Sequence, residues 1–367
     1  MSEAKKKALI AMSGGVDSSV SALLMQEAGY DCSGVYLHLC GAHLLPDSAS
    51  ENQQAPLDAA AVCEKLEMPF HTFDLTKEFE NKVIDYFVSS YEAGETPNPC
   101  ITCNRHLKFG ALLEIAKNLG NDVLVTGHYA RVEQDKNSGR WLLKTGLDES
   151  KDQSYMLYSL SQKQLAHIRL PLGDKTKEEC RLLAEKAGLV NAAKKDSQDI
   201  CFIPDGDYAS FIERSTGNTF PEGNFIDRTG KVLGRHRGII HYTIGQRRGI
   251  GVSANARLYV SDIDPVQNTV TLAEEKDFQI DTVYADHVSM VSGLPLPGKE
   301  KVLVKLRYRQ QERPATAWQD GERLIIRLDA PQRAPAPGQA AVLYDTDGET
   351  VLGGGTITGS ERKGDFV

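Results

Sequence analysis

The stretch KALIAMSGGVDSS, residues 7–19, joins a short apolar run to a helical pattern that continues to Ala28. Its two glycines, Gly14 and Gly15, allow a ligand to come close to the backbone at this junction. The N–H groups at the start of a helix, together with the positive end of the helix dipole, form a site for anions. The stretch therefore predicts a phosphate-binding loop between a strand and a helix, and a glycine turn that binds nothing is the alternative.

The loop lacks the lysine of the Walker A pattern, G-x-x-x-x-G-K-[ST], which contacts the phosphates when the γ phosphate is cleaved. Asp17 stands at the start of the helix, and its carboxylate would repel phosphate unless Mg²⁺ lies between them. We expect the loop, with the hydroxyls of Ser13, Ser18 and Ser19, to hold the β and γ phosphates of ATP as a leaving pyrophosphate. The string SGGVDSS resembles the loop of the N-type ATP pyrophosphatases, which attach AMP to a substrate oxygen and then displace it. The expected nucleotide-binding residues of the loop are Ala11, Met12, Ser13, Gly14, Gly15, Val16, Asp17 and Ser18, and Asp17 is also expected to be catalytic.

The first 200 residues alternate between strand-like and helical segments. This order is typical of an α/β domain built on a doubly wound parallel sheet, with helices on both faces. The strand-like segments are 7–12, 32–39, 70–75 and 122–127, and the helical segments are 17–28, 57–66, 78–91 and 104–119. Thr176, with Glu179 three residues later, has the form of a capping box and predicts the start of a helix that runs toward Ala187.

Beyond about Pro204 glycines become frequent and apolar residues alternate with polar ones, which predicts a change to short strands. A segment rich in Gly and Pro, 292–297, precedes the most regular alternation. We therefore expect a small middle domain and then a C-terminal all-β barrel, with a sandwich as the alternative. The expected domains are 1–207 for catalysis, 208–285 in the middle and 286–367 for the barrel.

Composition and charge limit the location and the partners of the protein. No apolar stretch approaches the length of a membrane span, and the N-terminus has no signal-peptide pattern. The seven cysteines are odd in number and have no framework spacing, so we expect a reducing, cytoplasmic location without structural disulfides. The net charge of −8 opposes broad binding to nucleic acid, and we expect no DNA partner. Two groups of basic residues either are solvated surface or contact RNA: Arg235, Arg237, Arg247 and Arg248, and Lys301, Lys305, Arg307, Arg309 and Arg313.

Two thiols, Cys100 and Cys103, lie three residues apart in TPNPCITCN, residues 96–104, just before a predicted helix. There the helix dipole and the free N–H groups would lower the pKa of a thiol and make it reactive. A redox pair or half of a zinc site are the alternatives for an isolated C-x-x-C pair. A third thiol, Cys201, lies in the string SQDICFI, residues 197–203.

Six motifs occur in one order along the chain: SGGVDSS, TPNPCITCN, TGHYAR (126–131), KDQSY (151–155), SQDICFI and YTIGQRRG (242–249). With them the chain resembles the tRNA-specific 2-thiouridylases, from about residue 8 to the string LGGGTI at 352–357. The resemblance implies an adenine nucleotide hydrolase-like fold and an enzyme that replaces the oxygen on carbon 2 of the wobble uridine of tRNA by sulfur. In such a reaction ATP adenylates the oxygen, sulfur borne by a cysteine attacks the activated carbon, and AMP leaves.

The resemblance also implies roles for single residues. Cys103 would be the nucleophile and Cys201 the carrier of a persulfide, loaded by a sulfur-relay donor protein, and the two would end as a disulfide that must be reduced. Leu37 and Gly127 would contact ATP. The residues implied to contact tRNA are Asn98, Pro99 and Cys100, which would line the pocket of the target base, His128, Lys151, Asp152 and Gln153, and, in the barrel, Arg307, Tyr308 and Gln339.

Cys100 leaves a second sulfur route open, because members of the family carry either Asp or Cys at this position. Three thiolates, Cys100, Cys103 and Cys201, could hold a four-iron four-sulfur cluster with one iron open to sulfide, or Cys100 could simply replace the Asp. Two other classes of function are also consistent with parts of the sequence. An amide-forming ligase would need the SGGVDSS loop but no paired thiols, and a noncatalytic iron-sulfur or RNA-binding module would need the thiols but not the loop.

Overall fold

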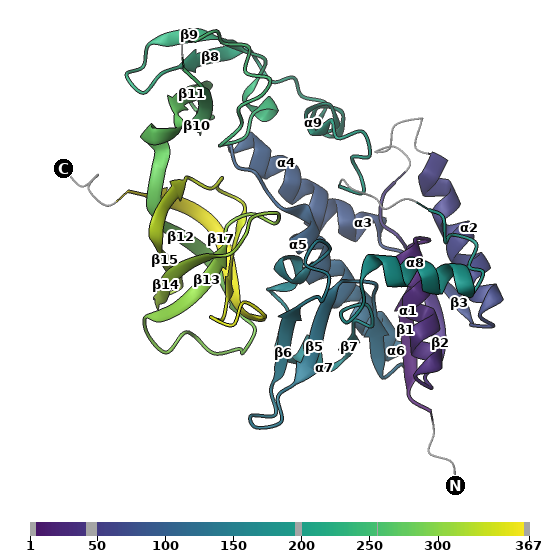
Figure 1. Ribbon diagram of the computed structural model, residues 1–367. Helices are drawn as coiled ribbons and strands as arrows, with labels where there is room; N and C mark the ends of the chain where they lie inside the picture. The colour runs from purple at the N-terminus through teal and green to yellow at the C-terminus, as the bar shows by residue number, and fades with distance from the viewer. Residues whose placement is uncertain (1–4, 42–49, 195–199, 255, 363–367) are drawn as a thin grey trace.

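A five-stranded parallel sheet forms the centre of the N-terminal part of the chain (Figure 1) in the computed structural model, which describes residues 5–41, 50–194, 200–254 and 256–362. The strands lie in the order β3-β2-β1-β4-β7, and neighbouring strands are parallel. They span Lys7–Ala11 (β1), Asp31–His38 (β2), Phe70–Asp74 (β3), Val123–Val125 (β4) and Ile168–Arg169 (β7). The α/β fold predicted from the alternation is therefore confirmed, although β4 is shorter than the predicted segment 122–127.

Successive residues of β1 pack on opposite faces of this sheet, as the pleat of a strand requires. Ala8 and Ile10 lie in one buried cluster, with residues of three helices on one face. Leu9 lies in a second buried cluster, with residues of two helices on the other face. The helices of the first face are α1 (Val16–Glu27), α2 (Ser50–Lys65) and α8 (Lys177–Lys186), and those of the second are α6 (Leu112–Asn118) and α7 (Gln162–Ala166). The sheet is thus doubly wound.

The winding of the sheet changes direction at β1. β2 pairs with one side of β1 and β4 with the other. In open α/β sheets such a change of direction opens a crevice at the carboxyl ends of the strands, and ligands bind there. The loop after β1, residues 12–15, and Gly127, just after β4, both lie at this crevice.

Helical segments connect β3 to β4 and carry the two cysteines of TPNPCITCN. α3 (Thr76–Phe79), η2 (Glu80–Ile84) and α4 (Asp85–Glu92) follow one another directly, and so do α5 (Pro99–Cys103), η3 (Asn104–Ala111) and α6. The helix predicted for 104–119 therefore begins earlier, at Pro99. Asn98 caps it by accepting a hydrogen bond from the N–H of Ile101 at 3.4 Å, and proline is favoured at the first helical position. Thr176 forms the predicted capping box at the start of α8.

A small domain of four strands follows the N-terminal part, next to α9 (Tyr208–Thr216). The strands lie in the order β10-β11-β8-β9, and β8 is parallel to β11 while the other pairs are antiparallel. They span Gly223–Ile226 (β8), Val232–His236 (β9), Leu258–Asp264 (β10) and Thr269–Glu274 (β11). Short 3-10 helices lie next to these strands at Ile239–His241 (η5) and Glu275–Phe278 (η6), and another lies in the N-terminal part at Ser154–Leu157 (η4). One buried cluster contains Phe87 of α4, Cys103 of α5, Phe211 of α9 and Val260 of β10. The middle domain thus packs directly against the helices that carry the thiols.

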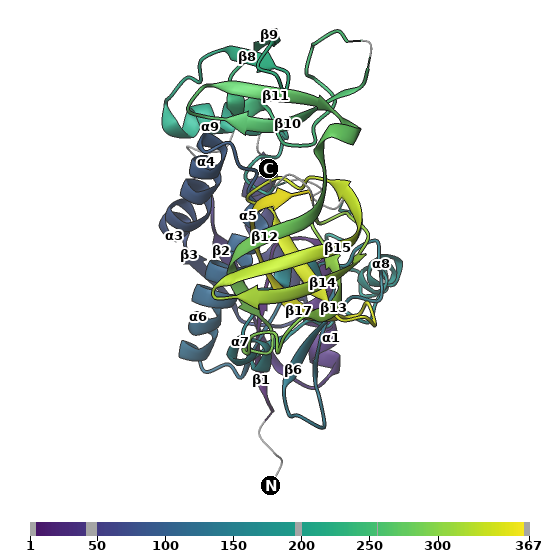
Figure 2. The ribbon, with the colours of Figure 1, turned by 90° about the vertical axis from the view of Figure 1, so that its left-hand side faces the viewer.

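Six antiparallel strands close into a barrel at the C-terminal end, and this barrel faces the viewer in Figure 2. The ring runs β12-β15-β14-β13-β16-β17, and the pairing of β17 with β12 closes it. The strands span Gln279–Met290 (β12), Glu300–Lys305 (β13), Arg313–Asp320 (β14), Arg323–Arg333 (β15), Ala340–Tyr344 (β16) and Thr350–Glu361 (β17). The predicted barrel is confirmed. β12 begins at Gln279 and so spans the boundary expected between residues 285 and 286.

The barrel shares a sheet with the N-terminal part. β17 pairs with β6 (Trp141–Thr145), which forms a hairpin with β5 (Ala130–Gln134). The sheet therefore has eight strands, and two of them lie outside the ring. Within the part of the chain that the structure describes, no helix has the length and apolar character that crossing a membrane requires.

Candidate active site

The loop after β1 presents backbone N–H groups at the start of α1. Gly15, the residue before the helix, is extended with ψ 167° and has no side chain to cap the first turn. Gly14 has φ +72°, and a Cβ at this position would lie 2.3 Å from the carbonyl oxygen of Ala55. Only glycine fits there. Among the described residues no side chain accepts a hydrogen bond from the N–H of Val16 or Asp17, so these groups are available to an anion.

Gly127 touches the same turn from the other side of the crevice. A Cβ on Gly127 would lie 2.9 Å from the carbonyl carbon of Asp17 and 3.0 Å from the backbone nitrogen of Ser18. Backbone atoms cannot rotate away from such a contact as the end of a side chain can. Gly127 therefore fixes how close the start of α1 lies to the end of β4.

A lysine that the loop itself lacks comes from α8. Lys177, the first residue of that helix, is only 9% exposed, and its Nζ lies 2.7 Å and 2.9 Å from the two carboxylate oxygens of Asp17. Tyr129 donates a further hydrogen bond to the same carboxylate at 2.8 Å. The acid that the sequence predicted to repel phosphate is thus neutralised in the free protein. Sequence reasoning missed Lys177 because 160 residues separate it from Asp17, and its place at the start of a capped helix was the only signal.

A second lysine reaches the loop from the segment after α8. Lys194 donates to the carbonyl oxygen of Gly14 at 3.3 Å and pairs with Asp58 of α2 at 2.8 Å. Asn191 donates to the same carbonyl at 3.2 Å and to the hydroxyl of Ser19 at 2.9 Å. These contacts hold the backbone of the loop and place the ammonium group of Lys194 next to it.

Two of the serines expected to donate to phosphate point inward. Ser18 and Ser19 are buried, and both hydroxyls donate to the carbonyl oxygen of Gly15 at 3.0 Å. Ser13 is exposed, and its hydroxyl donates to that of Ser18 at 3.2 Å. The expectation that the hydroxyls of Ser18 and Ser19 face the phosphates is wrong, because serine at the start of a helix can bond back to the preceding turn. A contact of the backbone N–H of Ser18 with phosphate stays a prediction.

Asp17 as arranged does not fit the expected role of a direct Mg²⁺ ligand. Both of its oxygens already accept hydrogen bonds from Lys177. Among the described residues no three His, Cys, Asp or Glu side chains are grouped closely enough to hold a metal ion. Mg²⁺ usually keeps several waters and binds through one or two carboxylates together with substrate phosphates. Lys177 therefore stands at Asp17 where the expected ion would lie.

Cys100 and Cys103 lie within the first turns of the helix that starts at Pro99, and not before it. Cys103 is buried, whereas Cys100 is exposed. Burial raises the pKa of both thiols, although the positive charge of Lys108 opposes this effect. The predicted lowering of their pKa is therefore wrong, because loss of water around a thiolate outweighs the favourable helix start.

Cys201 comes close to these two thiols from a separate segment. Burial raises its pKa to about 12, and the neighbouring Cys103 and Cys100 contribute to the rise. The thiol is nevertheless exposed to solvent. Both observations fit a side chain that water reaches through an opening while protein surrounds it on the other sides. The first three residues of the motif, Ser197, Gln198 and Asp199, lie outside the described residues.

Lys108 is the cation that lowers the pKa of all three thiols against the effect of burial. It lies in η3, a stretch of π-helix, and follows Cys103 by five positions. Residues at this spacing share one face of a π-helix. Sequence reasoning missed Lys108 because the same spacing on an ordinary α-helix points to a different face.

The three thiols do not form a site for an iron-sulfur cluster in this arrangement. Residues 5–41, 50–194, 200–254 and 256–362 contain no group of three cysteine, histidine or acidic side chains that could hold a metal ion. Cys103 is buried while Cys100 and Cys201 are exposed. We derive no step from a cluster.

Asn98 lines a pocket of about 210 Å³ between the thiol helix and the barrel. Arg105 and His106 line it from the helix, and Tyr158 and His287 line it from the opposite side. Among the described residues, Pro99 and Cys100 are not part of its wall. The structure thus brings one of the three expected base-pocket residues to a cavity and leaves the other two beside it.

Three residues implied to contact tRNA make contacts inside the protein. His128 is 8% exposed, and burial holds its pKa well below the usual value. Asp152 is also buried and accepts a hydrogen bond from the hydroxyl of Ser154 at 2.8 Å. The side-chain oxygen of Gln153 accepts a hydrogen bond from the N–H of Tyr129 at 3.1 Å. These contacts hold the backbone near the crevice, and a contact with tRNA stays a prediction for all three.

Arg307 and Tyr308 lie where the barrel meets the other two parts. Arg307 is exposed, and its guanidinium donates to the carbonyl oxygen of Ile244 in the middle domain at 3.3 Å. The ring of Tyr308 lies 5.9 Å from that of Tyr155, and Cys100 is among the groups that raise its pKa, after burial and Asp152. Tyr308 therefore connects the barrel to the neighbourhood of the thiols.

Gln339 of the barrel holds the segment that precedes the thiols. Its amide nitrogen donates to the carbonyl oxygens of Thr96 at 2.7 Å and of Pro97 at 3.4 Å.

Lys151 is half-buried in the turn before η4. Leu37, at the carboxyl end of β2, packs against both the cluster that contains Cys103 and the cluster that contains the core of the sheet. It thus links the nucleotide crevice with the thiols.

A doubly wound sheet with a glycine loop at its change of direction defines the class of α/β nucleotide-binding proteins. Three family models match the chain in order: the tRNA methyl transferase HUP domain at 6–205, the tRNA methyl transferase PRC-barrel domain at 209–274 and the aminomethyltransferase beta-barrel domain at 280–357. The tRNA-specific 2-thiouridylase MnmA of Moorella thermoacetica is 46% identical over 95% of this chain and 98% of its own. The tRNA-specific 2-thiouridylase MnmA 2 of Thermoanaerobacter sp. (strain X514) is 45% identical over 98% of this chain and 99% of its own. The chain belongs to the family of the tRNA-specific 2-thiouridylases.

Proposed function

We propose that the protein is an ATP-dependent sulfurtransferase that acts on tRNA. It replaces the oxygen on carbon 2 of the wobble uridine by sulfur and releases AMP and pyrophosphate. The names of the relatives support the reaction, since they are called tRNA-specific 2-thiouridylases. ATP would bind at the loop after β1, tRNA would approach from the side of the barrel, and a persulfide-bearing donor protein would supply the sulfur.

The observation that carries the proposal is the meeting of two thiols beside the crevice that holds the glycine loop. Cys103 comes from α5 and Cys201 from a separate segment, and Cys103 contributes to the rise in the pKa of Cys201. Leu37, at the end of the strand next to β1, packs against the cluster that contains Cys103. An activated oxygen held at the loop and a sulfur held at the thiols would thus lie in one place.

Adenylation of the uridine is the first step. The N–H groups at the start of α1 bind the β and γ phosphates, while Lys177 neutralises Asp17 and Lys194 holds the carbonyl of Gly14. The oxygen on carbon 2 attacks the α phosphorus, the bond to the β phosphate breaks, and pyrophosphate leaves with the electron pair. Mg²⁺ would enter with the triphosphate and screen its charge. Asp17 and Lys177 would position the phosphates as a neutral pair.

Sulfur transfer is the second step. The terminal sulfur of a persulfide on Cys201 attacks carbon 2, and AMP leaves with the electron pair of the carbon–oxygen bond. The thiolate of Cys103 then attacks the inner sulfur of Cys201, so that the new disulfide forms as the 2-thiouridine is released. A dithiol reductant must return two electrons and two protons to this disulfide before another turnover.

The exposures of the thiols support this division of roles. Cys201 is exposed, so an external donor can load it, whereas Cys103 is buried and reacts only with a partner inside the site. The expected disulfide between them and the tRNA contacts of Asn98, Arg307, Tyr308 and Gln339 belong to the same proposal. An amide-forming ligase would have no use for the two thiols.

Mass spectrometry of nucleosides tests the proposal directly. Unmodified tRNA is incubated with the protein, ATP, Mg²⁺ and a persulfide donor, and 2-thiouridine, AMP and pyrophosphate are measured. We expect all three products with the wild type, and none of the 2-thiouridine with Cys103→Ser or Cys201→Ser, while ATP still binds to both variants. Cys32→Ser is the matched control, because the Cys32 thiol lies at the start of β2 and donates to the carbonyl of Tyr30 as a hydroxyl can.

Three outcomes would contradict the assignment. ADP and orthophosphate in place of AMP and pyrophosphate would exclude adenylation. Full thiolation by the Cys103→Ser or Cys201→Ser variant would remove that residue from the sulfur route. Loss of thiolation in a Cys100→Ser variant, together with iron and sulfide in the anaerobically purified wild type, would favour the cluster route over the persulfide route.

A further inference from the structure

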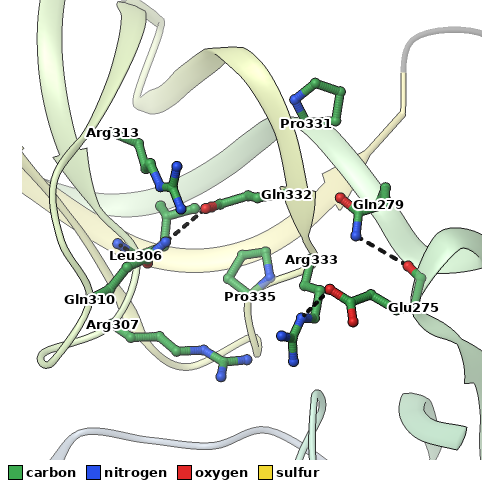
Figure 3. A pocket seen from close by; sticks show the side chains of 10 residues that line it. All are labelled: Glu275, Gln279, Leu306, Arg307, Gln310, Arg313, Pro331, Gln332, Arg333 and Pro335. Carbon is green, nitrogen blue, oxygen red and sulfur yellow. Dashed lines mark hydrogen bonds and ion pairs between the residues drawn. The ribbon is translucent and has the colours of Figure 1, made fainter. Parts of the chain in front are cut away.

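A second pocket, of about 440 Å³, lies where the barrel meets the end of the middle domain (Figure 3). The turn between β13 and β14, the end of β15 and the short helix η6 form its wall. Its volume is in the range of about 300–1,000 Å³ that is common for ligand sites. Nothing in the proposed adenylation or sulfur transfer uses it.

Three arginines and a single carboxylate line this pocket. Nε of Arg333 lies 3.0 Å from the carboxylate of Glu275. Arg307 and Arg313 have no carboxylate within ion-pair distance in the described part of the chain, and Figure 3 shows their side chains on the wall across from that pair. Burial and the charge of Arg333 lower the pKa of Arg307. Among the described residues, the pocket thus keeps an excess of positive charge from three arginines and one carboxylate.

Hydrogen bonds fix the wall of the pocket in the free protein. Gln310 accepts a hydrogen bond from the N–H of Leu306 at 3.2 Å and donates to the side chain of Gln332 at 2.7 Å, which ties the β13–β14 turn to the end of β15. The guanidinium of Arg333 also lies over the ring of Tyr259, 5.1 Å from its centre. The arginines are therefore presented by a braced wall, so less ordering is required when an anion binds.

We propose that this pocket binds a backbone phosphate of the tRNA between Arg313 and Arg333, and that Glu275 competes with the phosphate for Arg333. The inference rests on the proposed function, because it takes tRNA as the substrate. Guanidinium groups match the oxygens of a phosphate with paired hydrogen bonds. A carboxylate on one of three arginines makes the site weak for a lone anion and leaves it open to a long polyanion that brings several contacts.

The place of the pocket supports a role in docking RNA. Arg307 lines the pocket, and the next residue, Tyr308, lies between Tyr155 and the neighbourhood of Cys100. Arg313 and Arg333 are exposed, so the pocket opens to the surface. A strand whose base reaches the thiols would pass the pocket within a few nucleotides. The pocket would thus set the register of the RNA relative to the site.

Equilibrium binding of an unmodified tRNA transcript at several salt concentrations tests the inference. We expect Arg313→Gln and Arg333→Gln each to weaken binding about tenfold and to reduce the slope of log Kd against log salt by about 1. Glu275→Gln should tighten binding, because it frees Arg333. The matched controls are Lys276→Gln and Glu274→Gln, which remove one positive and one negative charge next to Glu275. These two residues form an ion pair of 3.0 Å and do not line the pocket, so both variants should bind tRNA like the wild type.

Catalytic measurements separate this inference from the proposed function. At saturating tRNA each pocket variant should give the wild-type rate of 2-thiouridine formation and the wild-type affinity for ATP. The pocket proposal is overturned if Arg313→Gln and Arg333→Gln bind tRNA like the Lys276→Gln control, or if Glu275→Gln weakens binding, and thiolation by the wild type then still stands. It is also overturned if inorganic pyrophosphate displaces tRNA from the wild type but not from Arg333→Gln, since the pocket would then take a free polyphosphate. A wild type that neither binds nor thiolates tRNA would refute both proposals.

Discussion

Replacing Gly127 by alanine tests whether the crevice between β1 and β4 positions the phosphate loop. The new Cβ would lie 2.9 Å from the carbonyl carbon of Asp17, 3.0 Å from its Cβ and 3.0 Å from the nitrogen of Ser18. Carbon atoms in ordinary contact lie about 3.5–4.0 Å apart, so the start of α1 must retreat by roughly 0.5–1 Å. That shift would move the N–H groups proposed to bind the phosphates and would stretch the hydrogen bonds of 2.7 Å and 2.9 Å between Lys177 and Asp17.

The size of the effect follows from this displacement. Overpacking a tight contact costs about 1–3 kcal/mol of stability, and a misplacement of about 1 Å in a catalytic site costs up to about 10²-fold in rate. We therefore expect Gly127→Ala to lower kcat/KM for ATP by about 10- to 100-fold in tRNA-dependent pyrophosphate release, while circular dichroism stays that of the wild type. The control is Gly298→Ala, since a Cβ there would meet no atom within 4 Å. A Gly127→Ala enzyme within twofold of the wild type would refute the reasoning.

Two further substitutions probe the lysines that the sequence did not reveal. Lys177→Met leaves the Asp17 carboxylate without its ion pair, and loss of a charged partner at such a partly buried pair costs about 1–3 kcal/mol. We therefore expect a lower midpoint of unfolding and at least tenfold weaker binding of ATP by calorimetry, partly restored in Lys177→Arg. Lys108→Met removes the charge that opposes the rise in the pKa of Cys201, so this pKa should rise further. Alkylation of Cys201 by iodoacetamide at pH 8 should therefore slow, whereas the control Lys108→Arg should be alkylated like the wild type. Unchanged ATP binding in the first case, or faster alkylation in the second, would contradict these roles.

Local patterns predicted the parts of the fold whose causes are local. The alternation of Ala8, Leu9 and Ile10 between two helix-covered faces makes β1 a continuous apolar run, and the glycine pair after it appears in the structure as an uncapped helix start. The capping box at the start of α8 joins Thr176 to Glu179, only three positions later. The pairing of β17 with β6 had no such signal, because hydrogen bonds between strand edges leave no pattern in either strand.

The sequence motifs identified the thiols and the loop of the candidate site, but not the two lysines that lie next to them. Lys177 and Lys108 act through space on residues that motifs identify, and their own surroundings in the sequence are ordinary for exposed helices. The pKa of the thiols was predicted in the wrong direction because the helix start is visible in the sequence, whereas the burial that outweighs it comes from the packing of other segments.

The raised pKa of Cys201 is consistent with a reaction that begins only after this residue has received sulfur from a donor. Burial and the neighbouring thiols raise the pKa of Cys201 to about 12, which disfavours the thiolate of the unloaded residue near neutral pH. A persulfide is a stronger acid than a thiol, so under the proposed mechanism the loading of Cys201 would create the nucleophile. Cys103 is buried, and the same packing raises its pKa, so in the proposed reaction its thiol would meet the persulfide from inside the site. Under the proposed mechanism, the burial that disfavours the thiolates would thus make Cys201 react first, once it is loaded, and Cys103 second.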